Sequence, residues 1–202
     1  MELKNVEYSW NGPLTKRNST KYIILHHRAG NGDAESIHNL HLSNGWTGIG
    51  YHFYVRKDGS IYRGRPVETV GAHCQGQNNH SVGVCFEGNF ENEKTMSAAQ
   101  VESGRTLVTY IKTLYPNAEV KRHKDFGGST CPGRYFPFDE VAKEVEVPKL
   151  ESANDIIWEL MNGELTVEIN DVDRAVKALD EAKNENSSLY WILYKIVNRK
   201  NL

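Results

Sequence analysis

The sequence lacks a long apolar run. No segment of the 202 residues approaches the roughly 20 consecutive apolar side chains that a membrane-spanning helix requires. The first ten residues mix charged and polar side chains, so they lack the apolar stretch of a secretory signal peptide. These absences predict a protein that is made in the cytosol, is not exported by the ordinary route and does not insert into a membrane.

The chain also has few cysteines and almost no net charge. Cys74, Cys85 and Cys131 are an odd number at wide spacing, which in a reducing compartment is typical of thiols or metal ligands rather than a disulfide framework. A formal net charge of -2 provides no basic footprint for nucleic acid, so we expect no nucleic-acid partner. The length is sufficient for one ordinary domain and a smaller one.

Strand signals dominate the first part of the chain, which we assign to one domain over residues 1–147. Residues 21–26 form a short apolar run typical of a buried strand. Residues 50–55 and 60–63 are rich in aromatic and β-branched side chains and flank a glycine-containing turn, which predicts a hairpin. Residues 81–87 predict a further strand.

Helix signals lie between and after these strands. Asp33 is a suitable N-cap for one helix, and Ser97 with Gln100 resembles a capping box at the start of another that ends before Pro116. A further helix is expected over about 137–145. Interleaved strands and helices predict an α/β domain with a mixed central sheet flanked by helices.

The pattern changes after Pro148. Ser152, Asn170 and Ser187 can each cap a short amphipathic helix. These signals predict a small all-α domain over residues 150–202, close to the lower size limit for independent folding.

Three residues in the first domain have the chemistry of metal ligands. His26 ends the first predicted strand, and His123 and Cys131 lie far along the chain with a Pro–Gly pair after the cysteine. Two imidazoles and one thiolate suit Zn²⁺ and leave a fourth position for water. The chain has eight histidines, so spacing alone leaves an ordinary structural role open for each.

The surrounding motifs occur in a fixed series. In chain order they are Ile23–His27, Gly48–Phe53, Asp58–Gly59 with Tyr62–Arg65, Gly71–His73, Asn78 with Ser81–Val84, and His123 with Cys131–Gly133. Over about residues 20–145 this series resembles the zinc-dependent N-acetylmuramoyl-L-alanine amidases, a family that includes phage lysozyme-amidases and peptidoglycan recognition proteins.

The resemblance implies roles for individual residues. It implies that His26, His123 and Cys131 bind zinc, whereas His27 points to the other side of its strand and is structural. Tyr51 matches a tyrosine whose hydroxyl lies near the metal, although from the sequence alone it is also compatible with an aromatic residue of the hairpin core.

Other positions match the substrate groove or depart from the family pattern. His73 and Asn78 match groove positions, but each is also compatible with an ordinary loop residue. Ser129 occupies a position where the family often has a lysine that stabilises the oxyanion, so it offers a hydroxyl without charge. Cys85 occupies the position of a catalytic glutamate found in some members. Glu87 faces the same side and is either the replacement base or a solvated carboxylate.

The tail carries a second resemblance. Segments 153–158 and 187–198 resemble the C-terminal cell-wall-binding module of endolysins from phages of Gram-positive spore-formers. Tyr190, Trp191 and Tyr194 lie on one predicted helix, where they either form an aromatic platform for sugars or pack the small core.

These resemblances imply an endolysin that cuts the amide bond between N-acetylmuramic acid and L-alanine and lyses Gram-positive bacteria. Its partners would be peptidoglycan and an associated wall polymer, and it would stay in the host cytoplasm until release to the wall. The alternatives are a host autolysin with the same chemistry, a non-catalytic peptidoglycan receptor, which typically lacks the metal-binding cysteine, and a metal-free structural protein.

Overall fold

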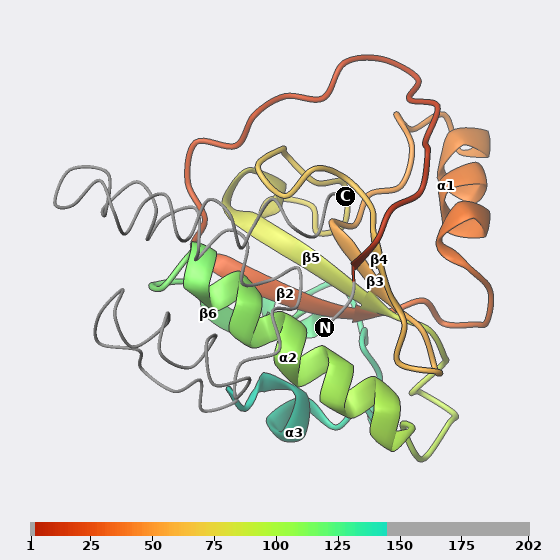
Figure 1. The fold of residues 1–202 in the computed structure, drawn as a ribbon, viewed down its shortest axis with the longest axis vertical. Coiled ribbons are helices and arrows are strands. Elements are labelled where there is room, and N and C mark those ends of the chain that lie inside the picture. The colour runs from red at the N-terminus through yellow and green to blue at the C-terminus, as the bar shows by residue number, and fades with distance from the viewer. Residues whose placement is uncertain (1–2, 145–202) are drawn as a thin grey trace, which may run out of the picture. The chain divides into compact units, whose positions relative to one another are not determined.

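A mixed six-stranded sheet forms the centre of residues 3–144, the part of the chain that the computed structural model describes (Figure 1). From one edge to the other the strands are β1 (Leu3–Lys4), β4 (Ile61–Arg63), β3 (Phe53–Val55), β5 (Ser81–Phe86), β2 (Tyr22–His27) and β6 (Glu119–Arg122). Only β3 and β4 pair antiparallel, as the predicted hairpin, and the other pairs are parallel. The expected α/β class with a mixed sheet is confirmed. The predicted helical domain over 150–202, with Tyr190, Trp191 and Tyr194, lies outside the described residues.

The two central strands carry the most apolar sequence. All six residues of β5 are buried, and Ile23, Ile24 and Leu25 of β2 have no exposed surface. The edge strands β1 and β6 were not predicted. β6 reads Glu-Val-Lys-Arg and lies at the edge of the sheet. None of its four residues is fully buried, so the strand needs no apolar run and the sequence gives no signal for it.

Helices begin at the predicted caps. α1 (Ala34–Ser43) follows Asp33, whose side chain accepts a hydrogen bond from the Ser36 amide. α2 (Ala98–Leu114) follows Ser97, which accepts from the Gln100 amide. The capping box is incomplete, since the Gln100 side chain donates to the carbonyls of Val55 and Glu87 instead of returning to the cap. The last helix, α3 (Phe138–Ala142), is shorter than the 137–145 segment predicted.

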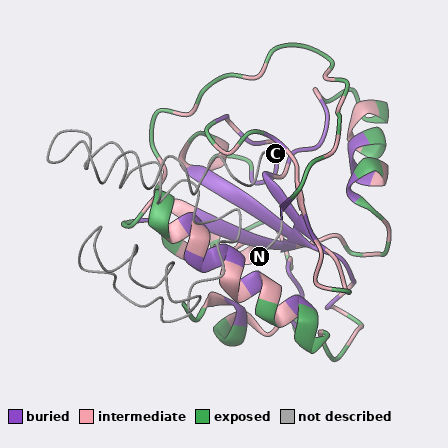
Figure 2. Cartoon of the chain, viewed as in Figure 1, coloured by how far each residue is buried: buried purple, intermediate pink, exposed green. Residues whose placement is uncertain are grey.

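The helices cover opposite faces of the sheet. α1 packs through Ala34 and Ile37 into a cluster that contains Cys85 of β5. The next residue, Phe86, points to the other face, because successive side chains of a strand alternate. There a Cβ on Gly104 of α2 would lie only 2.7 Å from the Phe86 ring, so glycine permits the close approach of helix and sheet. Figure 2 shows the buried strands between helices whose outward surfaces are exposed.

Two short 3₁₀ helices complete the described part and lie next to the candidate site. η1 (Asn78–His80) immediately precedes β5, and η2 (His123–Phe126) immediately follows β6. None of the helices between residues 3 and 144 is both long and apolar enough to cross a membrane.

Candidate functional site

Three potential metal ligands meet at the end of the β2–β6 pair. His26 lies near the end of β2, His123 opens η2, and Cys131 follows eight residues later. Their ligand atoms all lie within 4.8 Å of one another. His26 Nδ1 is 3.7 Å from Cys131 Sγ, and the two imidazole rings have their centroids 4.7 Å apart. The three residues, hereafter the triad, therefore form one constellation as the motif series implied.

Burial keeps the two imidazoles of the triad in the neutral form, which is the form that binds a metal. Burial, followed by the neighbouring His123 and His27, holds the pKa of His26 well below its ordinary value. Burial also lowers the pKa of His123, so both rings are neutral and each keeps a lone pair at neutral pH. Burial raises the pKa of the Cys131 thiol to about 11, so the thiol keeps its proton at neutral pH and would release it on binding a cation. This donor set fits Zn²⁺, which commonly takes imidazole and thiolate ligands.

His27 has the structural position expected for it. Its Nδ1 accepts a hydrogen bond from the Phe90 amide at 3.1 Å, on the side of the strand away from His26. Its backbone amide donates to Cys131 Sγ at 3.4 Å. The end of β2 thus contributes one triad ring and an amide that holds the sulfur of another member.

Tyr51 lies beside the triad. Its ring centroid is 5.2 Å from that of His26, and the side chain packs against the cluster that contains Cys85. Burial, and then the Cys85 and Cys131 thiols, raise the pKa of Tyr51 well above its ordinary value. The hydroxyl therefore keeps its proton at neutral pH and is a hydrogen-bond donor rather than a base. Cys85 belongs to the buried cluster against which Tyr51 packs.

His73 lies in the segment before η1, and Asn78 is the first residue of η1. His73 is only 9% exposed, and its Nδ1 lies 3.0 Å from His26 Nε2. The Asn78 side-chain oxygen accepts hydrogen bonds from the amides of His73 and Cys74, both at 2.9 Å. Asn78 therefore fixes the conformation of this segment, and His73 contacts a triad member directly, which the sequence did not reveal.

An open pocket of about 540 Å³ adjoins His123. Its lining residues are Cys74, Gln75, His123, Phe126, Gly127 and Gly128. Apart from His123, sequence reasoning did not select them. The glycine pair between two triad members was the available signal, because side chains there would fill the pocket. Ser129 follows this pair, and its hydroxyl oxygen accepts a hydrogen bond from the Cys131 amide at 3.1 Å.

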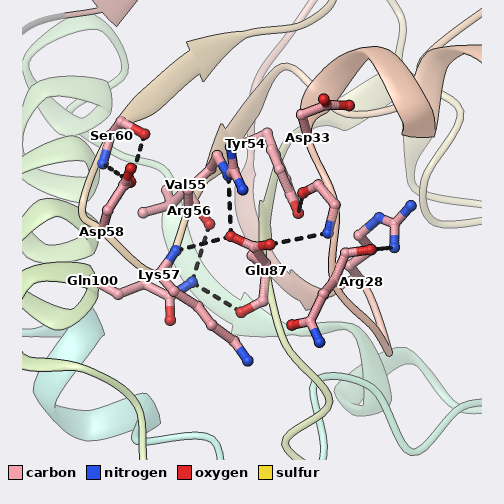
Figure 3. A network of polar contacts seen from close by, with 12 residues as sticks. Arg28, Asp33, Tyr54, Val55, Arg56, Lys57, Asp58, Ser60, Glu87 and Gln100 are labelled. Carbon is pink, nitrogen blue, oxygen red and sulfur yellow. Dashed lines mark hydrogen bonds and ion pairs between the residues drawn. The ribbon is translucent and has the colours of Figure 1, made fainter.

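Glu87 lies in a separate polar network (Figure 3). One carboxylate oxygen accepts from the Gly32 amide at 2.9 Å, and the other accepts from Arg56 Nε and the Lys57 amide, both at 3.1 Å. Burial opposes the charged form, but these donors outweigh it and lower the pKa of Glu87. Within residues 3–144 no hydrogen bond or ion pair joins Glu87 to the triad. A carboxylate with three donors and a lowered pKa is a poor proton acceptor, so its geometry does not fit the base role expected from the sequence.

Comparison with known proteins identifies the family of the chain. The family model for N-acetylmuramoyl-L-alanine amidase matches residues 16–134, more than half of the chain, and the match includes all three triad residues. The chain belongs to this family.

Relatives of this amidase-family chain include both lytic and recognition proteins. The endolysin of Klebsiella phage KP32 is 34% identical over 127 residues, covering 59% of this chain and 84% of the relative. Peptidoglycan-recognition protein SC2 of Drosophila melanogaster is 30% identical over 129 residues, covering 57% and 70%. Among solved structures, the N-acetylmuramoyl-L-alanine amidase LysC from Clostridium intestinale URNW is 41% identical, with a TM-score of 0.67, and covers 70% of this chain and 95% of its own.

Proposed function

We propose that this chain is a zinc-dependent amidase that hydrolyses the bond between N-acetylmuramic acid and L-alanine in peptidoglycan. The observation that carries the proposal is the triad, in which two neutral imidazoles and a thiol lie within 4.8 Å of one another beside an open pocket. His26, His123 and Cys131 would hold a zinc ion, which would supply Lewis acidity and a nucleophilic water at neutral pH.

The chain's own residues supply positioning and hydrogen bonds. The pocket next to His123 holds the substrate so that its lactyl carbonyl faces the triad. The Tyr51 hydroxyl, which stays protonated, donates to the oxygen of that carbonyl as negative charge develops on it. Ser129 is the second donor, since a hydroxyl that accepts from the Cys131 amide keeps its own proton available.

Product analysis of digested cell walls tests this reaction. Amide cleavage releases peptides with new N-terminal alanine and creates no new reducing sugar ends. A chelator should abolish the activity, and added Zn²⁺ should restore it. Wall binding without any release of alanine would instead identify a non-catalytic receptor. The relatives named as recognition proteins make this the second candidate function. New reducing ends would refute amide hydrolysis.

We also propose that the chain is an endolysin released from the host cytoplasm and that residues 150–202 attach it to a wall polymer of Gram-positive hosts. Support comes from the resemblance of the tail and from its aromatic residues Tyr190, Trp191 and Tyr194. Attachment would raise the effective concentration of enzyme at an insoluble substrate without changing the chemistry. In pull-downs with purified walls, a chain that ends near Lys149 should bind poorly and still cleave small muropeptides. Equal binding by the shortened and full chains would refute the targeting role.

A further inference from the structure

A row of buried polar groups continues behind the triad. His26 Nε2 lies 3.0 Å from His73 Nδ1, and the other nitrogen of His73 lies 3.4 Å from Ser81 Oγ. The Ser81 hydroxyl in turn donates to the Gln77 carbonyl at 2.8 Å. His26, His73 and Ser81 are all buried, so water does not compete for these hydrogen bonds.

The row has one consistent arrangement of protons. A carbonyl oxygen only accepts, so the Ser81 proton points to Gln77 and Ser81 Oγ accepts from His73 Nε2. A neutral imidazole has one N–H, so His73 Nδ1 is then an acceptor. His26 must donate to it from Nε2, which leaves the His26 Nδ1 lone pair free. That nitrogen is the one 3.7 Å from Cys131 Sγ, on the ligand side of the ring.

The fold also prevents His73 from moving away. Its ring lies in a slot between two glycines. A Cβ added to Gly71 would be 2.4 Å from the ring, and one added to Gly83 would be 2.5 Å from it. Asn78 fixes the backbone of His73 from outside the slot. Close contact with Gly71 and Gly83, together with the hydrogen bond from the His73 amide to Asn78, holds the ring in one position relative to His26.

We propose that His73 is a positioning residue that fixes the metal-binding tautomer of His26, with Ser81 setting the direction of the hydrogen-bond row. The inference rests on the proposed zinc site and deepens it. Partners of this kind orient a ligand ring and increase its basicity, and their loss typically lowers metal affinity about 10- to 100-fold. The assignment differs from a groove contact, because a groove contact would change substrate binding and leave metal affinity unchanged.

The tautomer is measurable in the metal-free protein. Long-range ¹H–¹⁵N NMR spectra distinguish a protonated Nδ1 from a protonated Nε2 in each imidazole. We expect the proton of His26 on Nε2 before any metal is added. A proton on His26 Nδ1, or an equal mixture of both forms, would overturn the proposal. This readout does not depend on activity, so it separates failure of the inference from failure of the proposed amidase function.

Zinc affinity of variants supplies the second test. His73→Phe keeps an aromatic ring but has no acceptor, and we expect its zinc affinity to fall about 10- to 100-fold. His73→Gln, whose amide oxygen can accept from His26 Nε2, should recover most of the loss. Ser81→Ala should weaken binding less than His73→Phe and partly mix the His26 tautomers.

A matched control separates this effect from general damage to the core. His38 is also buried and bridges the Ile49 amide and the Ser9 carbonyl, with no contact to His26. His38→Phe should lower thermal stability and keep the parent zinc affinity. If His73→Phe keeps parent affinity, or if His38→Phe and His73→Phe lose the same affinity, His73 has no positioning role.

Discussion

Two polar clusters lie near the ends of the same central strands and are built on opposite principles. The histidine cluster consists of the buried His26 and His73 and the half-buried His123, and desolvation keeps all three rings neutral by lowering the pKa of each. The carboxylate cluster pairs the buried Glu87 with the half-buried Arg56, and amide donors also bind the carboxylate. Glu87 lies only two residues from Cys85, the partner of His26 across the sheet.

The two clusters differ in whether their polar atoms have hydrogen-bond donors within the chain. In the carboxylate cluster both oxygens of Glu87 are occupied by donors from the chain itself, so the cluster is closed and joins the loop after β2 to the turn after β3. In the histidine cluster, ligand atoms of two rings and a thiol lie within 4.8 Å of one another, an arrangement that fits a cation. The first cluster therefore satisfies its charge within the chain, and the second fits the proposed metal site.

Removing a triad ligand should have the largest effect on this contrast. Cys131→Ser should lower zinc affinity more than 100-fold, beyond the ~10- to 100-fold loss of an outer partner. Amide hydrolysis should fall to background, while the melting temperature of the metal-free protein stays close to that of the parent. Cys74→Ser is the control for zinc affinity alone, since Cys74 lines the proposed substrate pocket but lies outside the triad. Zinc titration, calorimetry and wall digestion measure the three quantities, and parent-level activity of Cys131→Ser would contradict the zinc assignment.

Tyr51→Phe should separate chemistry from metal binding within the histidine cluster. The lost hydroxyl is assigned to the developing oxyanion, so kcat should fall about 10²- to 10³-fold, or roughly 3–4 kcal/mol. KM and zinc affinity should change little, because the ring still packs beside His26. Steady-state kinetics on a soluble muropeptide measure this split. A rise in KM with unchanged kcat would identify Tyr51 as a substrate-binding residue instead.

Glu87→Gln should lower the stability of the protein and leave its zinc affinity and kcat nearly unchanged. A neutral amide cannot replace a carboxylate that accepts from Gly32, Arg56 and Lys57, so we expect unfolding free energy to fall by roughly 2–4 kcal/mol. Zinc affinity and kcat should remain within about twofold of the parent, far from the 10²-fold scale of a lost general base. Chemical denaturation and kinetics decide the matter, and a collapse of kcat with stability retained would restore Glu87 as the base.

The smallest expected effect is a change in acid sensitivity. Because donors hold the folded-state pKa of Glu87 below its ordinary value, its stabilising contribution is complete above that value. The contribution is lost as pH falls through the lowered pKa. The stability difference between the parent and Glu87→Gln should therefore be greatest near neutral pH and shrink on acidification. Urea unfolding at a series of pH values measures it, and a constant difference would show that the Glu87 charge is not responsible.

The sequence predicted the features that depend on local chemistry. Asp33 and Ser97 cap helices because their side chains accept from amides three residues later, and this requires no knowledge of the fold. The triad was predicted from a resemblance. The contact of His73 with His26 spans 47 residues and depends on two glycines that admit the ring, so no local pattern encoded it. Strand alternation predicted the face of Glu87 but could not reveal the donors that surround it, so the sequence left its two roles open.

β6 connects the edge of the sheet to the triad. β6 pairs with β2 alone, at the edge of the sheet, and the two later members of the triad follow it along the chain. A cation shared with His26 would therefore link this outer strand to the interior one. Zinc binding should then slow amide hydrogen exchange in β6 more than in β5.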